Sequence, residues 1–436
     1  MNVLLIGGGG REHALAWKIS QSPLLEKFFA IPGSPGIKNF AECVENISID
    51  DNAALVKFAA DNAIDLVVVG PEAPLVNGLV DELNAVGISA FGLTKIAAQI
   101  EGSKIFAKRL MKKYNIPTAE FEVFDNPDAA KNYIRQKGAP IVIKADGLAA
   151  GKGVIVAQSL DEALNAVDEM KTFGSAGNKI VVEEFMDGEE VSVLALTDGE
   201  KIFPLIAAQD HKRVFDGDKG LNTGGMGAYA PAPIVDEKIA AQVEEKILKP
   251  TIAALKAEGI IYHGCLYAGL MIVDGTAKVV EFNCRFGDPE TQVVLPLMES
   301  DLLDLMNACA GGTLSEKKIS WSNQSAVCVI LASGGYPKSY KKNLPIDGIT
   351  KAKSLGAMIF HAGTKLIRND DVAETIPHFS LQIPNCLVTS GGRVLGVTIS
   401  APTLREAVDK VYRCVEVIHF DDMHYRRDIA VKGVRK

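Results

Sequence analysis

One segment carries residue types and a spacing that suit metal and phosphate chemistry. Glu281, Asn283 and Arg285 alternate after the apolar pair Val279-Val280, so we expect a strand with these three side chains on one face. A carboxylate and an amide oxygen are hard ligands that suit Mg²⁺ held partly by phosphates. An arginine beside them can stabilise charge on a transferring phosphoryl group. Polar alternation on an edge strand is the alternative, which the density of polar groups here disfavours.

A glycine-rich segment at residues 144–153 predicts a flap over phosphates. Strands are expected on either side of it, at Ile141–Ile143 and Val154–Val156. The Gly151-Lys152 pair is not part of a Walker A loop, because Gly153 stands where Ser or Thr must hold magnesium and a strand follows instead of a helix. A flexible flap with lysines at its base and tip can fold over a triphosphate. A mobile hairpin with solvated lysines is the alternative.

The glycine run Gly7–Gly10 predicts an anion site. It joins the apolar run Val3–Ile6 to a helix that begins near Arg11, and backbone N–H groups at the positive end of a helix dipole suit phosphate. A dinucleotide fingerprint is disfavoured, because the next strand, Phe28–Ile31, runs into Pro32–Gly36 without the acid that would hold ribose hydroxyls. We therefore expect a small phosphorylated ligand here, with a purely structural turn as the alternative.

Two polar clusters predict further parts of a nucleotide and substrate site. The acidic turn Glu183–Glu190 can offer carboxylates to ribose hydroxyls while its backbone reads adenine, although alone it would be interpreted as a solvated turn. The charged cluster Gln209–Arg213 precedes the glycine-rich loop Asn222–Tyr229, and this pair suits a small zwitterionic or anionic substrate. His211 is not decisive, and no Ser/His/Asp spacing or metal-type histidine cluster is found elsewhere.

Composition excludes several classes of protein. At ~100–200 residues per domain, 436 residues correspond to two to four domains. The contents of 47% hydrophobic and 23% charged residues disfavour a disordered chain, and the net charge of −8 disfavours generic nucleic-acid binding. Seven scattered cysteines without a CxxC pair predict reduced thiols of a cytosolic protein rather than disulfides or structural zinc. The sequence has no apolar run of ~18 residues, so no membrane-spanning helix is expected.

The order of expected elements predicts an α/β protein. Up to about residue 100, strand, glycine turn and helix alternate, as in an open parallel sheet. A basic amphipathic helix is expected from residue 102 to about 119, and a small α+β unit follows to about 190. A helix at about 236–258, a polar linker at 311–324 and a β-rich remainder with a helix near 403–416 complete the chain.

Together these motifs resemble the ATP-grasp superfamily and, within it, the glycinamide ribonucleotide synthetase (phosphoribosylamine–glycine ligase) family over essentially the full length. The resemblance rests on seven segments in order, at residues 7–15, 70–75, 101–104, 144–153, 209–213, 222–229 and 281–292. It implies an α/β fold in three parts. These are an N-terminal open parallel-sheet (Rossmann-like) domain at 1–101, a two-lobed α+β ATP-grasp core at 102–323 with a small lid lobe at about 120–190, and a small C-terminal β-rich domain at 324–436.

The resemblance implies ATP-dependent ligation of glycine to 5-phosphoribosylamine through a glycyl phosphate, in purine biosynthesis. It implies Mg²⁺ as cofactor, with Mn²⁺ possible, and ATP as co-substrate. We expect a cytoplasmic enzyme with small-molecule substrates, no nucleic-acid or membrane partner, and a monomer, with a homodimer as the alternative. Three rivals are disfavoured: an ATP-grasp carboxylase or formate-dependent transferase by the segments 209–213 and 222–229, an NAD-dependent oxidoreductase by the missing ribose acid, and a silent nucleotide-binding module by the intact phosphate and metal residues.

Carried over position by position, the resemblance assigns roles to individual residues. The catalytic set, with Arg285 facing the γ-phosphoryl group, is Arg285, Asp210, Lys212 and Arg213. The ATP-binding set is Lys104, Lys144, Gly147, Gly151, Lys152, Gly153, Glu183, Glu184, Phe185 and Glu190. The substrate-binding set, in which the glycine loop holds the ribosylamine phosphate, is Gly8, Gly9, Gly10, Arg11, Glu12, Thr223, Gly224 and Gly225. The metal ligands are Glu281 and Asn283.

The chain departs from the pattern of the superfamily at a few positions. Many ATP-grasp enzymes carry an acid on the strand before the metal-ligand strand, where this chain has Gly269, so water or phosphate is expected to complete the metal shell. Leu93 replaces a proline that is frequent in the family, which we expect to be harmless. Phe215, Lys219 and Leu221 stand where smaller or different residues are expected, so the local geometry of that loop is left open.

Overall fold

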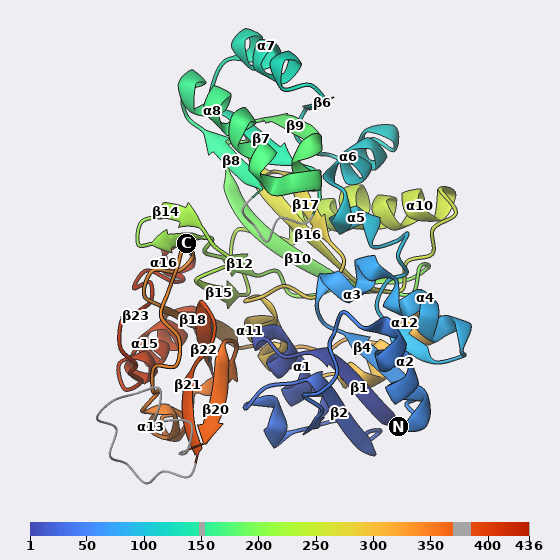
Figure 1. Cartoon of the computed structure of the whole chain (residues 1–436), viewed down its shortest axis with the longest axis vertical. Coiled ribbons are helices and arrows are strands. Elements are labelled where there is room, and N and C mark those ends of the chain that lie inside the picture. The colour runs from blue at the N-terminus through green and yellow to red at the C-terminus, as the bar shows by residue number, and fades with distance from the viewer. Residues whose placement is uncertain (148–152, 369–384, 436) are drawn as a thin grey trace.

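The computed structural model describes residues 1–147, 153–368 and 385–435. Figure 1 shows an N-terminal domain, a lid lobe at the opposite end of the molecule, a central core between them and a C-terminal domain beside the N-terminal one. The predicted α/β class, with an N-terminal parallel sheet and antiparallel sheets after it, is confirmed. Gly151 and Lys152, at the tip of the predicted flap, lie outside the described residues.

The N-terminal domain is a parallel sheet in the strand order β3-β2-β1-β4-β5. Its strands are β1 (Asn2–Gly7), β2 (Lys27–Pro32), β3 (Glu42–Cys43), β4 (Leu66–Val69) and β5 (Ser89–Phe91). Its helices are α1 (Gly10–Ile19), η1 (Ile37–Asn39), α2 (Asn52–Asp61), α3 (Glu72–Asn77) and α4 (Leu79–Ala85). Alternate residues of β1 belong to two different apolar clusters, one with Leu15 of α1 and one with Leu55 of α2, which explains why its sequence is apolar throughout.

The lid lobe is an antiparallel sheet in the order β6-β9-β7-β8. Its elements are β6 (Phe121–Phe124), α7 (Pro127–Lys137), β7 (Ile141–Ala145), β8 (Val154–Ala157), α8 (Leu160–Met170), η2 (Lys171–Asn178) and β9 (Ile180–Glu184). Local sequence determines both long helices: Asn126 and Ser159 cap their first turns, and Gly138 ends α7 with a positive φ. The lobe has its own small core, which includes Ile134 and Val167.

The central core is an antiparallel sheet in the order β11-β10-β16-β17. Its strands are β10 (Glu189–Thr197), β11 (Ile202–Pro204), β16 (Gly264–Val273) and β17 (Thr276–Asn283). The helices around it are α5 (Gln99–Gly102), α6 (Lys104–Lys113), α9 (Glu237–Val243), η3 (Glu244–Leu248), α10 (Lys249–Ala257), α11 (Thr291–Val294), η4 (Leu295–Leu297), α12 (Leu302–Gly311) and η5 (Leu314–Glu316).

One sequence-based helix boundary in the core is wrong, and the segment expected as a linker packs against the core. The helix expected to reach about residue 119 ends at Lys113, because Asn115 adopts a positive φ and Pro117 follows two residues later. The polar stretch at 311–324 is not a free linker. Leu314 is fully buried and its N–H donates to Asp198 at 2.9 Å, and Trp321 pairs with Met298 in an isolated bridge.

The C-terminal sheet has the order β12-β15-β18-β22-β19, with β23 pairing β18. Its strands are β12 (Gln209–Asp210), β15 (Gly227–Ala230), β18 (Ser325–Ser333), β19 (Met358–His361), β22 (Arg393–Ala401) and β23 (Met423–His424). In the described part of this domain, two antiparallel strand pairs flank the sheet: β13 (Arg213–Phe215) with β14 (Lys219–Asn222), and β20 (Thr364–Arg368) with β21 (Asn385–Thr389). The described helices beside it are α13 (Ile349–Ser354), α15 (Leu404–Val415) and α16 (Val431–Val434). Because β12 and β15 precede residue 323, this sheet combines strands from both sides of the expected domain boundary.

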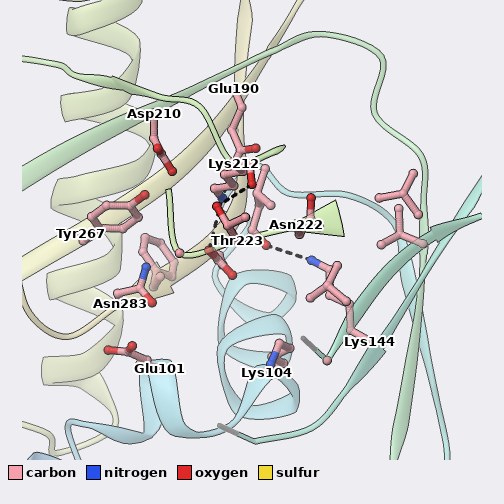
Figure 2. Close-up of a pocket in the computed structure, with 18 of the residues that line it drawn as sticks. Glu101, Lys104, Lys144, Glu190, Asp210, Lys212, Asn222, Thr223, Tyr267 and Asn283 are labelled. Atoms are coloured by element: carbon pink, nitrogen blue, oxygen red, sulfur yellow. Dashed lines mark hydrogen bonds and ion pairs between the residues drawn. The ribbon is translucent and has the colours of Figure 1, made fainter. Parts of the chain in front are cut away.

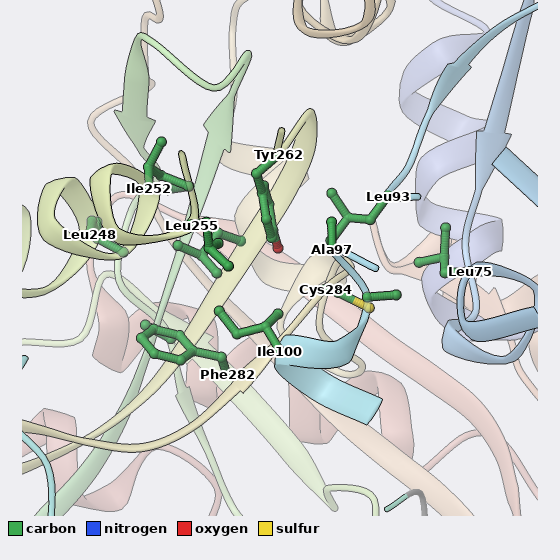
Figure 3. Close-up of a cluster of buried hydrophobic side chains, with 14 of the residues drawn as sticks. Leu75, Leu93, Ala97, Ile100, Leu248, Ile252, Leu255, Tyr262, Phe282 and Cys284 are labelled. Carbon is green, nitrogen blue, oxygen red and sulfur yellow. The ribbon is translucent and has the colours of Figure 1, made fainter. Parts of the chain in front are cut away.

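One apolar cluster joins the N-terminal domain to the core. Leu75 and Leu93 of the N-terminal domain belong to it, together with Ile252 of α10 and Phe282 of β17. Figure 3 shows Ile100 of α5 beside Cys284 and Phe282 within this cluster. The cluster therefore fixes α5 against the strand that carries the predicted metal ligands. In the described part of the chain, no helix has both the length and the apolar character needed to cross a bilayer.

A buried histidine pair joins the N-terminal and C-terminal domains and predicts acid sensitivity. The His361 N–H donates to His13 Nδ1 at 2.7 Å. Burial lowers the pKa of His13 to about 3 and that of His361 to about 4, with Lys353 nearby adding to both shifts. Between about pH 6.5 and pH 4 each histidine is protonated in the unfolded chain but neutral in the folded chain. The free energy of unfolding therefore falls by about 1.4 kcal/mol per pH unit for each histidine as the pH is lowered.

Urea unfolding at pH 7, 6 and 5 measures this effect. His13→Gln removes one titrating group and keeps an acceptor for the His361 N–H, so its stability should fall less steeply with acid than that of the parent chain. Equal slopes for the two proteins would contradict the assignment.

Candidate active site

A cavity of about 1070 Å³ lies between the lid lobe, the core and the C-terminal domain. Figure 2 shows Lys104, Lys144, Glu190, Asp210 and Lys212 arranged around it. Most of the residues predicted for a site line this one cavity: Arg11, Lys104, Lys144, Gly147, Gly153, Glu183, Glu184, Phe185, Glu190, Asp210, Lys212, Arg213, Thr223, Gly224, Glu281, Asn283 and Arg285. Of the predicted residues that the structure describes, five do not line it: Gly8, Gly9, Gly10, Glu12 and Gly225.

The two predicted metal ligands lie at the end of β17. Glu281 pairs across the sheet with Gly269, and Asn283 pairs with Tyr267. Burial alone would raise the pKa of Glu281, but Lys212, Lys144, Lys104 and Arg285 together lower it, so this carboxylate is ionised at neutral pH. Among the described residues no group of three or more acidic, histidine or cysteine side chains is placed to hold a metal. The protein therefore offers one carboxylate and one amide oxygen, which suits a cation that takes its other ligands from phosphate and water.

Lys144, on β7 of the lid lobe, is held in place by a buried carboxylate. Glu183 Oε2 lies 2.9 Å from Lys144 Nζ and 2.8 Å from Lys108 Nζ, and all three side chains are at least 95% buried. Burial lowers the pKa of Lys108 to about 8, although Glu183 opposes the shift. The second oxygen, Glu183 Oε1, is buried with no hydrogen-bond partner in the described ranges. Glu183 thus has a structural function that its sequence position did not reveal, and it keeps one free acceptor.

Lys104 begins α6 beside the predicted flap. Its Nζ donates to the Gly147 carbonyl oxygen at 2.9 Å, and Ser103 caps the helix by accepting from the Phe106 N–H at 3.1 Å. Asp146 accepts from the Ile105 N–H at 3.1 Å and so connects the same helix end to β7. Because the base of the flap and the start of α6 are tied together, Lys104 and Lys144 are directed to the same cavity (Figure 2).

Lys212 is the cation in the centre of the cavity. It forms an ion pair with Glu190, and its Nζ lies 3.6 Å from Glu281 Oε1. Burial alone would lower its pKa, but Glu190 and Glu281 raise it well above the ordinary value, so Lys212 is charged. One lysine therefore connects the residue predicted for ribose with the residue predicted for metal.

Asp210 and Glu290 form an acidic pocket beside Lys212. Burial raises the pKa of Asp210 well above its ordinary value, and the charge of Glu290 raises it further while Lys212 opposes the shift. Glu290 Oε1 accepts hydrogen bonds from Ser192 Oγ and Tyr267 Oη, both at 2.9 Å. A cationic group of a ligand would relieve the repulsion between these two carboxylates.

The glycine run after β1 is closely packed against its neighbours. Gly9 N–H donates to Glu12 Oε2 at 2.8 Å, and the Arg11 backbone hydrogen-bonds Asp288 and helps to lower its pKa. A Cβ on Gly8 would collide with the Gly33 carbonyl, and one on Gly10 would stand 2.7 Å from Gln292 Nε2. That Gly8–Gly10 and Glu12 bind substrate stays a prediction. Glu12 accepts from the Gly9 N–H, Asp288 from the Arg11 N–H, and of this segment Arg11 lines the cavity.

The loop at 223–225 is closed by its own side chains and by the C-terminal domain. Thr223 Oγ1 donates to the Lys212 carbonyl at 2.9 Å and accepts from the Gly225 N–H at 3.0 Å. Gly225 has a φ of +107°, and a Cβ there would stand 2.6 Å from Asp210 Oδ1, so its role is to let the loop approach Asp210. Arg393 Nη1 donates to the Gly224 carbonyl at 2.5 Å and to the Asp288 carbonyl at 2.7 Å.

The hairpin that starts at Arg213 is fixed by the C-terminal segment. Arg426, 1% exposed, bonds the Arg213 carbonyl at 3.1 Å, Asp218 at 2.8 Å and Asp428 at 2.7 Å. Arg213 itself donates to the Gly220 carbonyl at 2.7 Å. The loop whose geometry the sequence left open, which contains Phe215, Lys219 and Leu221, is thus a short hairpin. The side chains of Phe215 and Leu221 are more than 45% exposed.

Several residues that shape the cavity were missed by the sequence reasoning. Glu101, Asp288 and Glu290 lie inside segments that carry the resemblance, so a buried partner for each nearby cation could have been sought there. Lys108 had only the weak signal of a lysine on the apolar face of α6. Arg393 had none, because its strand is more than 100 residues from all of the predicted site residues and only the fold brings it close to them.

Comparisons with known proteins agree with this geometry. Three family models of phosphoribosylglycinamide synthetase match in order: the N domain at residues 1–101, the ATP-grasp (A) domain at 102–291 and the C domain at 326–432. The phosphoribosylamine–glycine ligase of Yersinia pestis is 48% identical over 442 residues, which cover 100% of both chains.

Solved structures agree as well. The crystal structure of the Thermotoga maritima phosphoribosylamine–glycine ligase has a TM-score of 0.81 and 31% identity, covering 99% of this chain and 100% of its own. The biotin carboxylase domain of the Hydrogenobacter thermophilus 2-oxoglutarate carboxylase, solved with MgADP and bicarbonate, has a TM-score of 0.70 at 15% identity and covers 97% of this chain and 91% of its own. The second likeness shows the shared fold alone. The chain belongs to the phosphoribosylamine–glycine ligase family of ATP-grasp proteins.

Proposed function

We propose that this chain ligates glycine to 5-phosphoribosylamine and converts ATP to ADP and phosphate. A carboxylate is a poor acylating agent at neutral pH, so the glycine carboxylate first attacks the γ-phosphorus of ATP and ADP leaves. The ribosylamine nitrogen then attacks the carbonyl carbon of glycyl phosphate, phosphate leaves, and the nitrogen loses a proton as the amide forms. The observation that carries this proposal is the single cavity that joins the phosphate lysines, the β17 ligands and the 210–224 segment.

The described residues provide positions for the parts of ATP. Lys104 and Lys144 face the cavity from two sides and suit the negative phosphates. Glu183 Oε1, buried without a partner in the described ranges, suits the amino group of adenine. Glu190 suits a ribose hydroxyl. The predicted roles of Gly147, Gly153, Glu184 and Phe185 remain part of this proposal, since each lines the same cavity.

We place the ammonium of glycine next to Asp210 and Glu290 and its carboxylate toward Arg285. The acidic pocket favours a cation, and protonation keeps the glycine nitrogen from acting as a nucleophile in place of the ribosylamine. Arg285 and Lys212 can neutralise the charge that develops on the transferring phosphoryl group. Arg11, Arg213, Thr223 and Gly224 border the remaining space, which we assign to the ribosylamine.

Mg²⁺ fits the residues at the end of β17. Glu281 and Asn283 would hold it, and the absence of an acid at Gly269 leaves the other positions of its shell to water and to ATP oxygens. The bound ion would neutralise phosphate charge. Mn²⁺ has the same preference for oxygen ligands and is expected to substitute.

Phosphate release under defined substrates tests the proposal. Release should require ATP, Mg²⁺, glycine and freshly prepared 5-phosphoribosylamine together, and the product should be glycinamide ribonucleotide. Bicarbonate and formate should not replace glycine. Release that depends on either of them, or that needs no ribosylamine, would sink the proposed reaction.

A further inference from the structure

Two carboxylates face Arg285, and they hold it differently. Glu101 Oε1 lies 2.9 Å from Arg285 Nη2, whereas Glu72 Oε2 lies 3.4 Å from Arg285 Nε. The Glu101 side chain is 7% exposed and that of Glu72 is 34% exposed. Arg285 Nη2 also donates to Asn283 Oδ1 at 3.5 Å, and Nη1 donates to the Phe286 carbonyl at 3.3 Å. Among these side chains, Glu101 makes the shortest contact with the guanidinium and therefore holds it most firmly.

The second oxygen of Glu101 is fixed as well. Glu101 Oε2 accepts from the Cys284 N–H at 2.8 Å and from the Cys284 thiol at 3.1 Å. Because both of its oxygens are bound, the Glu101 carboxylate has one orientation. Its ion pair therefore also fixes the orientation of the Arg285 guanidinium.

The segment that carries Glu101 also starts the phosphate-facing helix. Glu101 lies in α5, whose Ile100 packs beside Phe282 and Cys284 in the buried cluster (Figure 3). Two residues later Ser103 caps α6, and Lys104 reaches the Gly147 carbonyl. One turn of chain thus sets the distance between a lysine assigned to ATP phosphates and the arginine assigned to the phosphoryl group.

We propose that Glu101 is the positioning residue for Arg285, and that it holds the guanidinium in the orientation required during phosphoryl transfer. This inference rests on the proposed reaction, because it needs Arg285 to face the γ-phosphoryl group. Glu101 touches no reacting atom. Its contribution is to hold the guanidinium, which lines the cavity, in one orientation.

Glu101→Gln tests the proposal. Steady-state kinetics of the full chain are measured with ATP, Mg²⁺, glycine and 5-phosphoribosylamine. A glutamine keeps the size of the side chain but loses the charge that binds Arg285. We expect kcat to fall about 10- to 100-fold, which is the range typical when a residue that orients an active-site side chain is lost. KM for ATP should change less than threefold. Glu258→Gln is the matched control, because it removes a carboxylate from an ion pair with Lys113 that does not line the cavity.

A binding measurement separates positioning from general damage to the fold. ADP with aluminium fluoride and glycine mimics the phosphoryl-transfer state, and Glu101→Gln should bind it at least 10-fold more weakly while binding the non-hydrolysable ATP analogue AMPPNP normally. Equal weakening of both ligands, or kcat within threefold of the parent chain, would overturn the proposal.

If Glu101→Gln does not fold, Cys284→Ala provides the test, because it removes only the thiol donor. Its kcat should fall at least threefold at unchanged KM for ATP, and an unchanged kcat would overturn the inference. Failure of the proposed function is distinguishable from all of these outcomes, because it would be seen as absence of glycine-dependent turnover in the parent chain.

Discussion

Glu281→Ala is expected to lower kcat more than about 100-fold. Loss of a residue that only supports a metal ligand already lowers affinity or activity 10- to 100-fold, so loss of a ligand should exceed that range. Glu281 is one of two oxygen ligands that β17 offers, and Gly269 opposite supplies no replacement. Turnover measured against Mg²⁺ concentration, and direct Mn²⁺ binding by electron paramagnetic resonance, should both show the loss.

The control for this change is Glu200→Ala. Glu200 pairs with Lys256, its side chain is 74% exposed, and it does not line the cavity. Its kcat and Mn²⁺ affinity should equal those of the parent chain. Near-normal kcat or normal Mn²⁺ affinity in Glu281→Ala would refute the metal assignment, whatever the control shows.

Glu183→Gln is expected to reduce the free energy of unfolding by about 3 kcal/mol or more. The change removes the negative charge between Lys108 and Lys144, and removing one partner from a buried ion pair costs about 3–5 kcal/mol because the remaining charge stays buried. Chemical denaturation followed by circular dichroism measures this loss. KM for ATP should rise as well, because Lys144 loses the contact that holds it in place on β7 of the lid lobe.

Glu184→Gln is the matched control on the same strand. Glu184 forms an ion pair with Lys278 at 3.3 Å, and its side chain is 41% exposed. An exposed ion pair of this kind contributes ~0.2–1 kcal/mol, so the control should lose less than about 1 kcal/mol of stability. Similar losses in both variants would show that burial of the Glu183 ion pairs does not stabilise the lid.

Much of the fold could be predicted because local sequence determines it. The apolar run of β1 with its glycine turn, the Asn126 and Ser159 caps of the lid helices, and the strand–flap–strand pattern around Lys144 all depend on neighbours within a few residues. The end of α6 was missed because a positive φ at Asn115 has only a weak sequence signal. The domain boundary expected near residue 323 stays a prediction, and only the fold shows that β15, from before it, pairs with β18, from after it.

The site, like the fold, could be predicted from the sequence only where neighbouring residues determine it. Residue type and period 2 along β17 placed Glu281 and Asn283 together, and the cavity brings both to the lysines of β7 and α6. The glycines at 8–10 have the pattern of a phosphate loop, and the described structure shows that close packing also requires glycine at Gly8 and Gly10. A close approach to Gly33 or Gln292 requires glycine as strictly as a phosphate does, so the residue type alone cannot separate the two causes.

By itself, the sequence determined the types of chemistry this chain can perform: which strand ends bear oxygen ligands, which loops bear lysines and which carry only glycine. The tertiary structure decided which of those groups share one electrostatic environment. Glu183 between two buried lysines, Asp210 beside Glu290, and Glu101 against Arg285 are contacts between segments tens to hundreds of residues apart. Charge interactions in a buried site depend on distance and burial, and both exist only after the chain has folded.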